Sequence, residues 1–133
     1  MQELVGRLTA LDPEASESLK VVAYFDALVS AGVGLDGLLR GAAALSGAVA
    51  GAERRGRVTR WDPRGTRLDG EGSVRSPERV GPTARVWLER EDKEHANDAM
   101  VVERLGLAVE LLDSRGVPEN ALDVALDAAR PVG

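Results

Sequence analysis

Arginines are the residues of this sequence with the clearest capacity for chemistry. Six of them lie close together, at Arg54, Arg55, Arg57, Arg60, Arg64 and Arg67. Guanidinium groups bind carboxylates and phosphates well, so the group could hold an anionic ligand or dock onto an acidic domain. The acidic neighbours Glu53, Asp62 and Asp69 favour a different interpretation, in which these arginines form a solvated sheet face with balanced charge.

Two tryptophans accompany the arginines in predicted strands. Trp61, Trp87, Arg60 and Arg85 could together surround an anionic or aromatic small molecule, and they are the predicted ligand-binding residues. The tryptophans fit equally well as cover between a sheet and a helix, or as part of a dimer interface. We favour the structural interpretation and keep a small-molecule sensor as the alternative.

The sequence contains few residues that could act in catalysis or bind a metal. The chain has no cysteine, which excludes disulfides, thiol catalysis and thiolate metal sites. Its single histidine, His95, lies in a polar connector, where we expect a solvated side chain rather than a general base. The carboxylates around it lack the spacing of a calcium-binding loop. We therefore expect a protein that is not an enzyme, with no catalytic residue, metal or cofactor.

Composition limits the partners and the compartment. A length of 133 residues suits one domain. The net charge of −5 argues against nucleic-acid binding by this segment, because phosphate neutralisation needs a basic surface. The most apolar stretch, residues 21–39, is interrupted by Asp26 and Asp36, so we expect no membrane span. The first residues lack the layout of a signal peptide, which predicts a cytoplasmic protein.

Helical periodicity recurs along most of the chain. The predicted helices are Gln2–Leu11, a helix that starts at Asp12-Pro13-Glu14 and runs to about Ala31, Leu35–Ser46, Asp98–Ser114, and a last helix from Pro118. Glycines at 32, 34 and 47 are expected to end the second and third helices. The run Arg115-Gly116-Val117-Pro118 is expected to end the fourth.

Strand patterns occupy the middle of the chain. Residues 48–50, 57–61 and 66–68 are predicted strands, with Asp62-Pro63-Arg64-Gly65 as the turn between the last two. Residues 70–83 are predicted to be a loop. Residues 84–90 alternate, with Ala84, Val86 and Leu88 on one face. The predicted fold class is α+β, with a small antiparallel sheet of three to four strands flanked by long helices.

So small a sheet cannot shelter every apolar helix face, which predicts a helical-bundle homodimer. The expected interface draws on the second helix and on the long helix that begins near Asp98. Its residues are Leu19, Val22, Phe25, Val29, Val101, Leu105, Ala108 and Leu112.

Several stretches resemble one family of regulators. The run LDPEASESLKVVAYFDALVSAGVGLDGLLRGAAALSG (residues 11–47) is similar to the opening of the GAF-like amino-terminal domain of actinobacterial PucR-type transcriptional regulators. RVWLER (residues 85–90) and VVERLGLAVELLDSR (residues 101–115) resemble the last strand and closing helix of that domain. NALDVALDAARPVG (residues 120–133) is similar to the linker that follows it.

The resemblance implies a signal-sensing or dimerisation module in transcription regulation. It divides the chain into a degenerate GAF-like domain (residues 1–116) and a linker helix (residues 117–133) that leads to a DNA-binding helix-turn-helix domain downstream. The stretch from Val49 to Arg85 is short for a full GAF domain, which makes dimerisation the expected role. The alternatives are a sensor of an anionic or aromatic metabolite and a stand-alone interaction adaptor.

Overall fold

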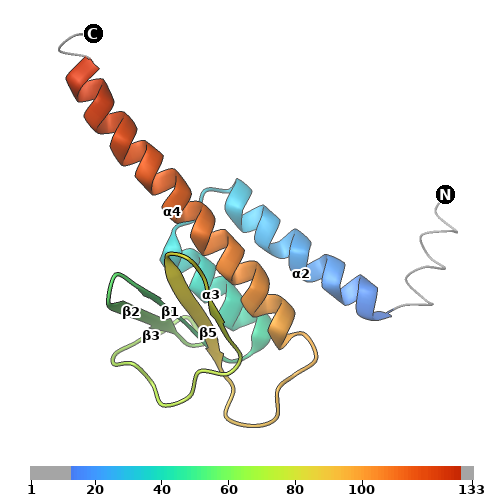
Figure 1. Ribbon diagram of the computed structural model, residues 1–133. Helices are drawn as coiled ribbons and strands as arrows, with labels where there is room; N and C mark the ends of the chain where they lie inside the picture. Colours follow the sequence, from blue (N-terminus) through green and yellow to red (C-terminus); the bar gives the residue numbers. More distant parts are fainter. Residues whose placement is uncertain (1–12, 130–133) are drawn as a thin grey trace, which may run out of the picture.

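The computed structural model describes the backbone of residues 13–129 and the side chains of residues 16–114 (Figure 1). The predicted helix Gln2–Leu11 lies outside these residues. The elements are α2 (Pro13–Ser30), α3 (Leu35–Ser46), β1 (Val49–Arg54), β2 (Arg57–Trp61), β3 (Arg67–Leu68), β4 (Glu78–Val80), β5 (Ala84–Glu89) and α4 (Asp98–Ala129). The described chain is α+β, as predicted.

The ends of α2 and α3 follow the glycines. After α2, Gly32 takes a positive φ of 75°, a conformation that only glycine adopts without cost. α3 has the predicted bounds, and Gly47 ends it in the left-handed conformation while donating its N–H to the Ala43 carbonyl over 2.8 Å. Gly41 of α3 allows a close approach to α2, because a Cβ there would lie 2.8 Å from Leu28 Cδ1.

The sheet has five antiparallel strands in the order β3-β2-β1-β5-β4. The prediction of three to four strands missed β4, a three-residue strand within the predicted loop 70–83. The Asp62 turn between β2 and β3 is confirmed, since the Asp62 carboxylate accepts hydrogen bonds from the backbone of Arg64 and Thr66. The alternation of β5 is also confirmed: Ala84, Val86 and Leu88 face the core.

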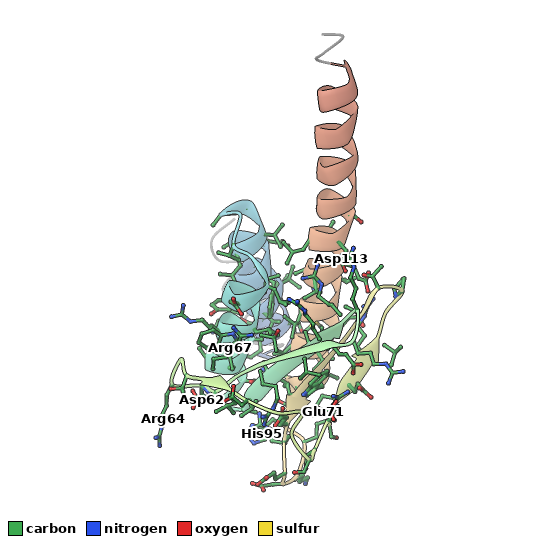
Figure 2. All side chains as sticks on the ribbon, turned by 90° about the vertical axis from the view of Figure 1, so that its left-hand side faces the viewer. Asp62, Arg64, Arg67, Glu71, His95 and Asp113 are labelled. Carbon is green, nitrogen blue, oxygen red and sulfur yellow. The ribbon has the colours of Figure 1, made fainter. Side chains whose placement is uncertain are left out.

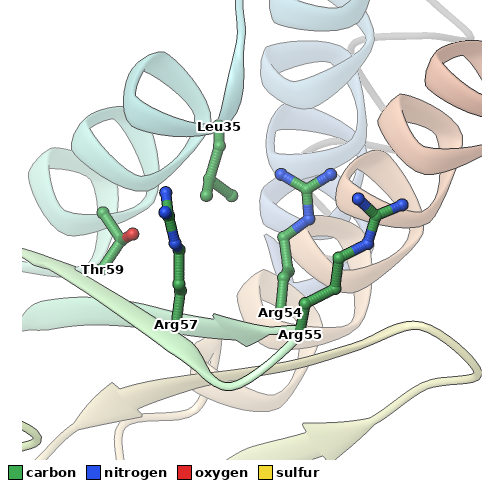
Figure 3. A pocket seen from close by; sticks show the side chains of 5 residues that line it. All are labelled: Leu35, Arg54, Arg55, Arg57 and Thr59. Atoms are coloured by element: carbon green, nitrogen blue, oxygen red, sulfur yellow. The ribbon is translucent and has the colours of Figure 1, made fainter. Parts of the chain in front are cut away.

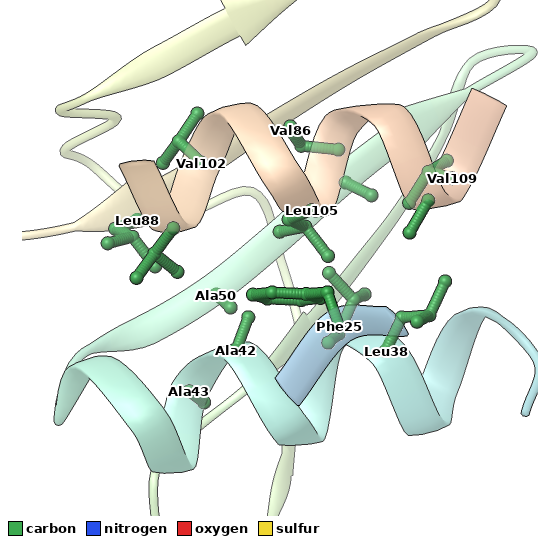
Figure 4. Packing of buried hydrophobic residues seen from close by; sticks show 14 of the residues in the cluster. Phe25, Leu38, Ala42, Ala43, Ala50, Val86, Leu88, Val102, Leu105 and Val109 are labelled. Atoms are coloured by element: carbon green, nitrogen blue, oxygen red, sulfur yellow. The ribbon is translucent and has the colours of Figure 1, made fainter. Parts of the chain in front are cut away.

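The three helices of residues 13–129 lie on one side of the sheet. α3 and α4 pack on the strands, and α2 packs on α3 and α4 (Figure 1). Phe25 of α2 lies between α3 and α4, beside Ala42 and Leu105 (Figure 4). A single apolar core therefore joins the sheet to all three helices.

Half of the predicted dimer interface belongs to this core. Phe25, Val101, Leu105 and Ala108 are at most 3% exposed in the single chain, so they have no area left to bury against a second copy. The prediction is wrong for these four residues, because α2, α3 and the sheet cover them within the protomer. Leu105→Glu would therefore unfold the protomer rather than test an interface.

The other four predicted interface residues keep some exposure. Leu19 is 69% exposed and Val22 is half-buried, whereas Val29 and Leu112 are half-buried and pack against the core. These four side chains alone cannot form the broad helical seam that the apolar stripes predicted. The stripes were correctly recognised as buried faces, but the partner that buries most of them is the same chain.

α4 is one continuous helix of 32 residues. The predicted stop at Arg115-Gly116-Val117-Pro118 is wrong, because the helix continues through these four residues. The first half of α4 packs on β5, and the second half projects beyond the sheet (Figure 1). Within residues 13–129, no helix is both long enough and apolar enough to cross a membrane.

Candidate functional site

The four predicted ligand-binding residues do not surround one cavity. In the sheet register, Trp61 of β2 lies opposite Ala50 of β1, whereas Trp87 of β5 lies opposite Gly51. Successive residues of a strand point to opposite faces, so the two tryptophans are on opposite sides of the sheet. The expected arrangement of both tryptophans around one ligand is therefore wrong.

Trp61 fastens β2 to α3 on the helix-covered face. Its Nε1 donates a hydrogen bond to Asp36 Oδ1 over 2.9 Å. The Arg40 guanidinium lies over the indole, 5.2 Å from the ring centroid, at a distance that suits a cation–π contact. Both partners belong to α3, so the tryptophan serves as cover between sheet and helix, one of the two structural interpretations that the sequence left open.

Trp87 is fully buried on the face of the sheet opposite α2, α3 and α4. Its indole lies against Gly51, where an added Cβ would come within 2.4 Å of the ring. The Arg75 guanidinium stacks on the indole at 3.8 Å from the centroid, and Glu53 Oε1 accepts a hydrogen bond from Arg75 over 3.1 Å. Gly51 and Arg75 cover the indole, so the ring has no surface free to contact a ligand.

Arg60 completes this closed arrangement. It forms a two-point ion pair with Glu89, over 2.7 Å from Nε and 2.6 Å from Nη2, and it donates from Nη1 to the Asp69 carbonyl. The hydrogen bond to Glu89 raises the pKa of Arg60 despite the opposing effect of burial. Glu89 also accepts from Trp87 Nε1 over 3.0 Å. Arg85 is exposed and takes no part in this network.

A second ion pair joins the far ends of three elements. Asp98, 2% exposed at the start of α4, accepts hydrogen bonds from Arg90 Nε and Nη2, both over 2.9 Å. Arg90 also donates to the Ser46 carbonyl at the end of α3 over 2.8 Å. Burial raises the pKa of Asp98, but the hydrogen bonds from Arg90 and from the His95 backbone outweigh it and hold the pKa below its ordinary value.

His95 contributes its backbone to this pair, while its side chain is exposed in the loop before α4 (Figure 2). Among the residues whose side chains are described, no three histidine, aspartate or glutamate residues gather as metal ligands would. The loop before α4 is therefore bounded by a structural ion pair, between Arg90 and Asp98.

The six arginines of the predicted basic group separate into three places. Arg60 lies in the closed network, and Arg64 and Arg67 are exposed near the β2–β3 turn, at the opposite end of the sheet from Asp113 (Figure 2). Arg54, Arg55 and Arg57 gather at the β1–β2 hairpin, where Leu35 and Thr59 join them to line a cavity of about 460 Å³ (Figure 3).

The hairpin itself brings these three arginines together. Its two turn residues, Arg55 and Gly56, both have positive φ angles, of 53° and 79°, as a tight two-residue hairpin requires. Arg54 and Arg57 face each other in the register. Both lie on the helix side of the sheet, since they keep the alternation of Ala52 and Thr59.

Arg54 is shared between this cavity and α4. It forms an ion pair with Asp113, whose carboxylate also accepts a hydrogen bond from the Thr83 hydroxyl. Burial raises the pKa of Asp113, but hydrogen bonds from Thr83 and Arg54 and the nearby charges of Arg54 and Arg55 outweigh it and lower the pKa overall. Glu110, one turn earlier in α4, accepts hydrogen bonds from the backbone of Thr83 and Ala84 over 3.2 and 3.3 Å.

Sequence reasoning noticed the arginines but missed Thr83, Glu110 and Asp113. Glu110 and Asp113 are three residues apart, so they share one helix face. That spacing is the only signal the sequence carries, because the partner Arg54 is 59 positions away from Asp113.

Comparisons of the chain with protein-family models, with curated proteins and with solved structures find no match. The resemblance to PucR-type regulators therefore stays a prediction.

Proposed function

We propose that this chain is a non-catalytic regulatory module that forms a homodimer and uses α4 to position a DNA-binding domain of a PucR-type regulator. The observation that carries the proposal is the course of α4. The helix is anchored in the core along its first half and continues without interruption to Ala129. A rigid rod rooted in a folded body is a suitable connection between a module and a second domain.

The anchoring of α4 is extensive. Val101, Leu105 and Val109 are at most 2% exposed in the apolar core. Directly after Val109 and within the next turn, Glu110 and Asp113 bind the start of β5 and the end of β1. The 15 residues from Arg115 to Ala129 then extend for about 22 Å at the usual helical rise. Movement of the body would therefore be transmitted along the helix.

The exposed leucines of the chain indicate a different surface for contact with the second copy. Leu107 and Leu111 are 38% and 46% exposed, and at a spacing of four residues they share one face of α4. Leu19 of α2 is a third exposed leucine. Full burial of a leucine side chain contributes roughly 1.5–3 kcal/mol relative to exposure, so the α4 face that includes Leu107 and Leu111 could support association.

A fusion assay tests the dimer. A DNA-binding domain that occupies its palindromic operator only as a dimer is joined after Gly133, and operator occupancy is measured by gel shift. We expect the chain to confer occupancy and the double variant Leu107→Glu/Leu111→Glu to abolish it. Ala99→Glu, at another exposed position of α4, is the matched control and should retain occupancy. Equal occupancy in both variants would refute the α4 surface, and no occupancy with the unaltered chain would refute the dimer.

Helix phase tests whether α4 positions the second domain. Two residues inserted between Leu122 and Asp123 rotate whatever follows by about 200°, whereas seven residues rotate it by about 700°, nearly two full turns. We expect the two-residue insertion to lower operator occupancy and the seven-residue insertion to preserve it. Dimers that tolerate both insertions equally would favour a stand-alone adaptor, in which α4 sets no orientation.

A further inference from the structure

The helix side of the sheet is left uncovered at one end. α3 starts at Leu35 and α4 leaves the sheet after Asp113, and the β1–β2 hairpin extends between them (Figure 3). The side chains of Arg54 and Arg57 point from the hairpin toward Leu35, and Arg55 lies beside Arg54 (Figure 3). Three guanidinium groups thus surround one cavity of about 460 Å³.

Positive charge in this cavity is only partly balanced. Asp113 pairs with Arg54, but no carboxylate of the described residues lies within ion-pair distance of Arg55 or Arg57. The α3 helix begins at the cavity with Gly34 as its N-cap and no side-chain capping hydrogen bond, and Asp36 is the one acidic residue of its first turn. Three guanidinium groups and one carboxylate leave an excess of two positive charges.

We propose that this cavity binds the dianionic phosphate group of a small phosphorylated metabolite, and that the bound anion shares Arg54 with Asp113. Guanidinium groups donate paired hydrogen bonds that match phosphate oxygens. The Thr59 hydroxyl can donate another, and Leu35 supplies an apolar wall for the organic part. The cavity volume lies within the range of small-molecule sites, roughly 300–1,000 Å³.

Charge favours this ligand over a nucleic acid. A phosphate dianion would neutralise the two excess charges of the cavity. A nucleic-acid backbone would need an extended basic surface. Here the other three arginines of the predicted basic group are in the closed network or near the β2–β3 turn, and the chain as a whole carries a net charge of −5.

Sharing of Arg54 links the ligand to α4. An anion held by Arg55 and Arg57 attracts the Arg54 guanidinium and competes with Asp113, which is the last described anchor before α4 projects from the body. Binding would weaken this anchor, and by thermodynamic reciprocity loss of the anchor would strengthen binding. The regulatory meaning of this competition rests on the proposed role of α4, whereas the binding does not.

Calorimetric titration with inorganic phosphate, glucose 6-phosphate and malonate tests the site. We expect both phosphates to bind and malonate, a dicarboxylate, to bind more weakly. Arg57→Gln should weaken phosphate binding at least about tenfold, the usual effect of losing a hydrogen bond to a charged group. Arg64→Gln, an exposed arginine outside the cavity, is the matched control and should change nothing.

Asp113→Asn supplies a test of opposite sign. Removal of the competing carboxylate should tighten phosphate binding by roughly fivefold, the scale of a partly exposed ion pair. A purely structural role for Asp113 would weaken binding or leave it unchanged. Circular dichroism verifies the fold of each variant, and if Asp113→Asn does not fold, Arg55→Gln replaces it, with an expected loss of affinity.

Three results would overturn the proposal. They are no heat of binding with either phosphate, equal losses in Arg57→Gln and Arg64→Gln, and malonate binding as tight as phosphate binding. None of them bears on the homodimer, which is measured by operator occupancy. Conversely, a monomeric chain that binds phosphate with the expected variant pattern would refute the proposed module and leave the site intact.

Discussion

Asp98→Asn should be among the most damaging single-atom changes in this protein. The Asp98 side chain is 2% exposed and that of its partner Arg90 is 10% exposed. Two hydrogen bonds of 2.9 Å join them, and a third reaches Asp98 from the His95 backbone. The substitution removes the negative charge and leaves the Arg90 guanidinium buried without a counterion.

The expected loss is about 3–5 kcal/mol in the free energy of unfolding, the usual cost of removing one partner from a buried ion pair. That is a large share of the total for a domain, about 5–15 kcal/mol. Glu17→Gln is the matched control: it breaks the exposed Glu17–Lys20 pair and should cost less than about 1 kcal/mol.

Urea unfolding at neutral pH, followed by circular dichroism, measures both variants. The double variant Arg90→Met/Asp98→Leu removes both charges and should recover much of the loss, because the remaining groups no longer bury an uncompensated ion. A loss below about 1 kcal/mol for Asp98→Asn, or no recovery in the double variant, would refute this account of the ion pair.

The pH dependence of the free energy of unfolding gives an independent measure of the Arg90–Asp98 ion pair. The folded pKa of Asp98 lies below its unfolded value, so the ion pair stabilises the protein above the unfolded pKa. That contribution is lost as the pH falls through the folded pKa. The difference in stability between the unaltered chain and Asp98→Asn should therefore narrow from about pH 4 downward. A difference that stays constant to pH 2 would contradict this assignment.

Two further predictions concern the face of the sheet opposite α2, α3 and α4. Gly51→Ala should lower the free energy of unfolding by about 1–3 kcal/mol in thermal denaturation, because the new Cβ would collide with the buried indole of Trp87, whereas Gly34→Ala, with open space around it, should cost far less. An equal cost at both glycines would argue against the close contact. Arg75→Ala should uncover Trp87 and shift the fluorescence emission to longer wavelength, while Arg85→Ala should not. Unchanged emission in both would disprove the stacking of Arg75 on the ring.

Features set by local sequence were predictable. α3 has the bounds that its apolar spacing and Gly47 indicated, because helix periodicity and a glycine stop act within a few residues of each other. β5 shows its core and outer faces in the predicted alternation. β4 escaped notice because a strand of three residues is too short to display a period.

The course of α4 shows where local penalties mislead. A glycine costs a helix roughly 1 kcal/mol and a proline roughly 3 kcal/mol relative to alanine. Such costs favour a break at Gly116 and Pro118, but they do not forbid a helix, and α4 continues through both positions. Sequence spacing alone cannot show whether the rest of a helix compensates for such a cost.

The site and the interface needed information that no local pattern holds. The opposite faces of Trp61 and Trp87 follow from the pairing of β2 and β5 with β1. The contact between Arg54 and Asp113 likewise depends on where α4 crosses the sheet. An apolar stripe indicates that a helix face is buried, but not which residues cover it. Leu105 was therefore assigned to the interface with a partner copy, whereas its own chain covers it.

Sedimentation equilibrium of the 133-residue chain is the most direct test of the proposed regulatory dimer. The account predicts a mass of twice 14.1 kDa at micromolar concentration. It also predicts a return to the single-chain mass in Leu107→Glu/Leu111→Glu and no change in Ala99→Glu. A single species of 14.1 kDa at every concentration of the unaltered chain would contradict the account.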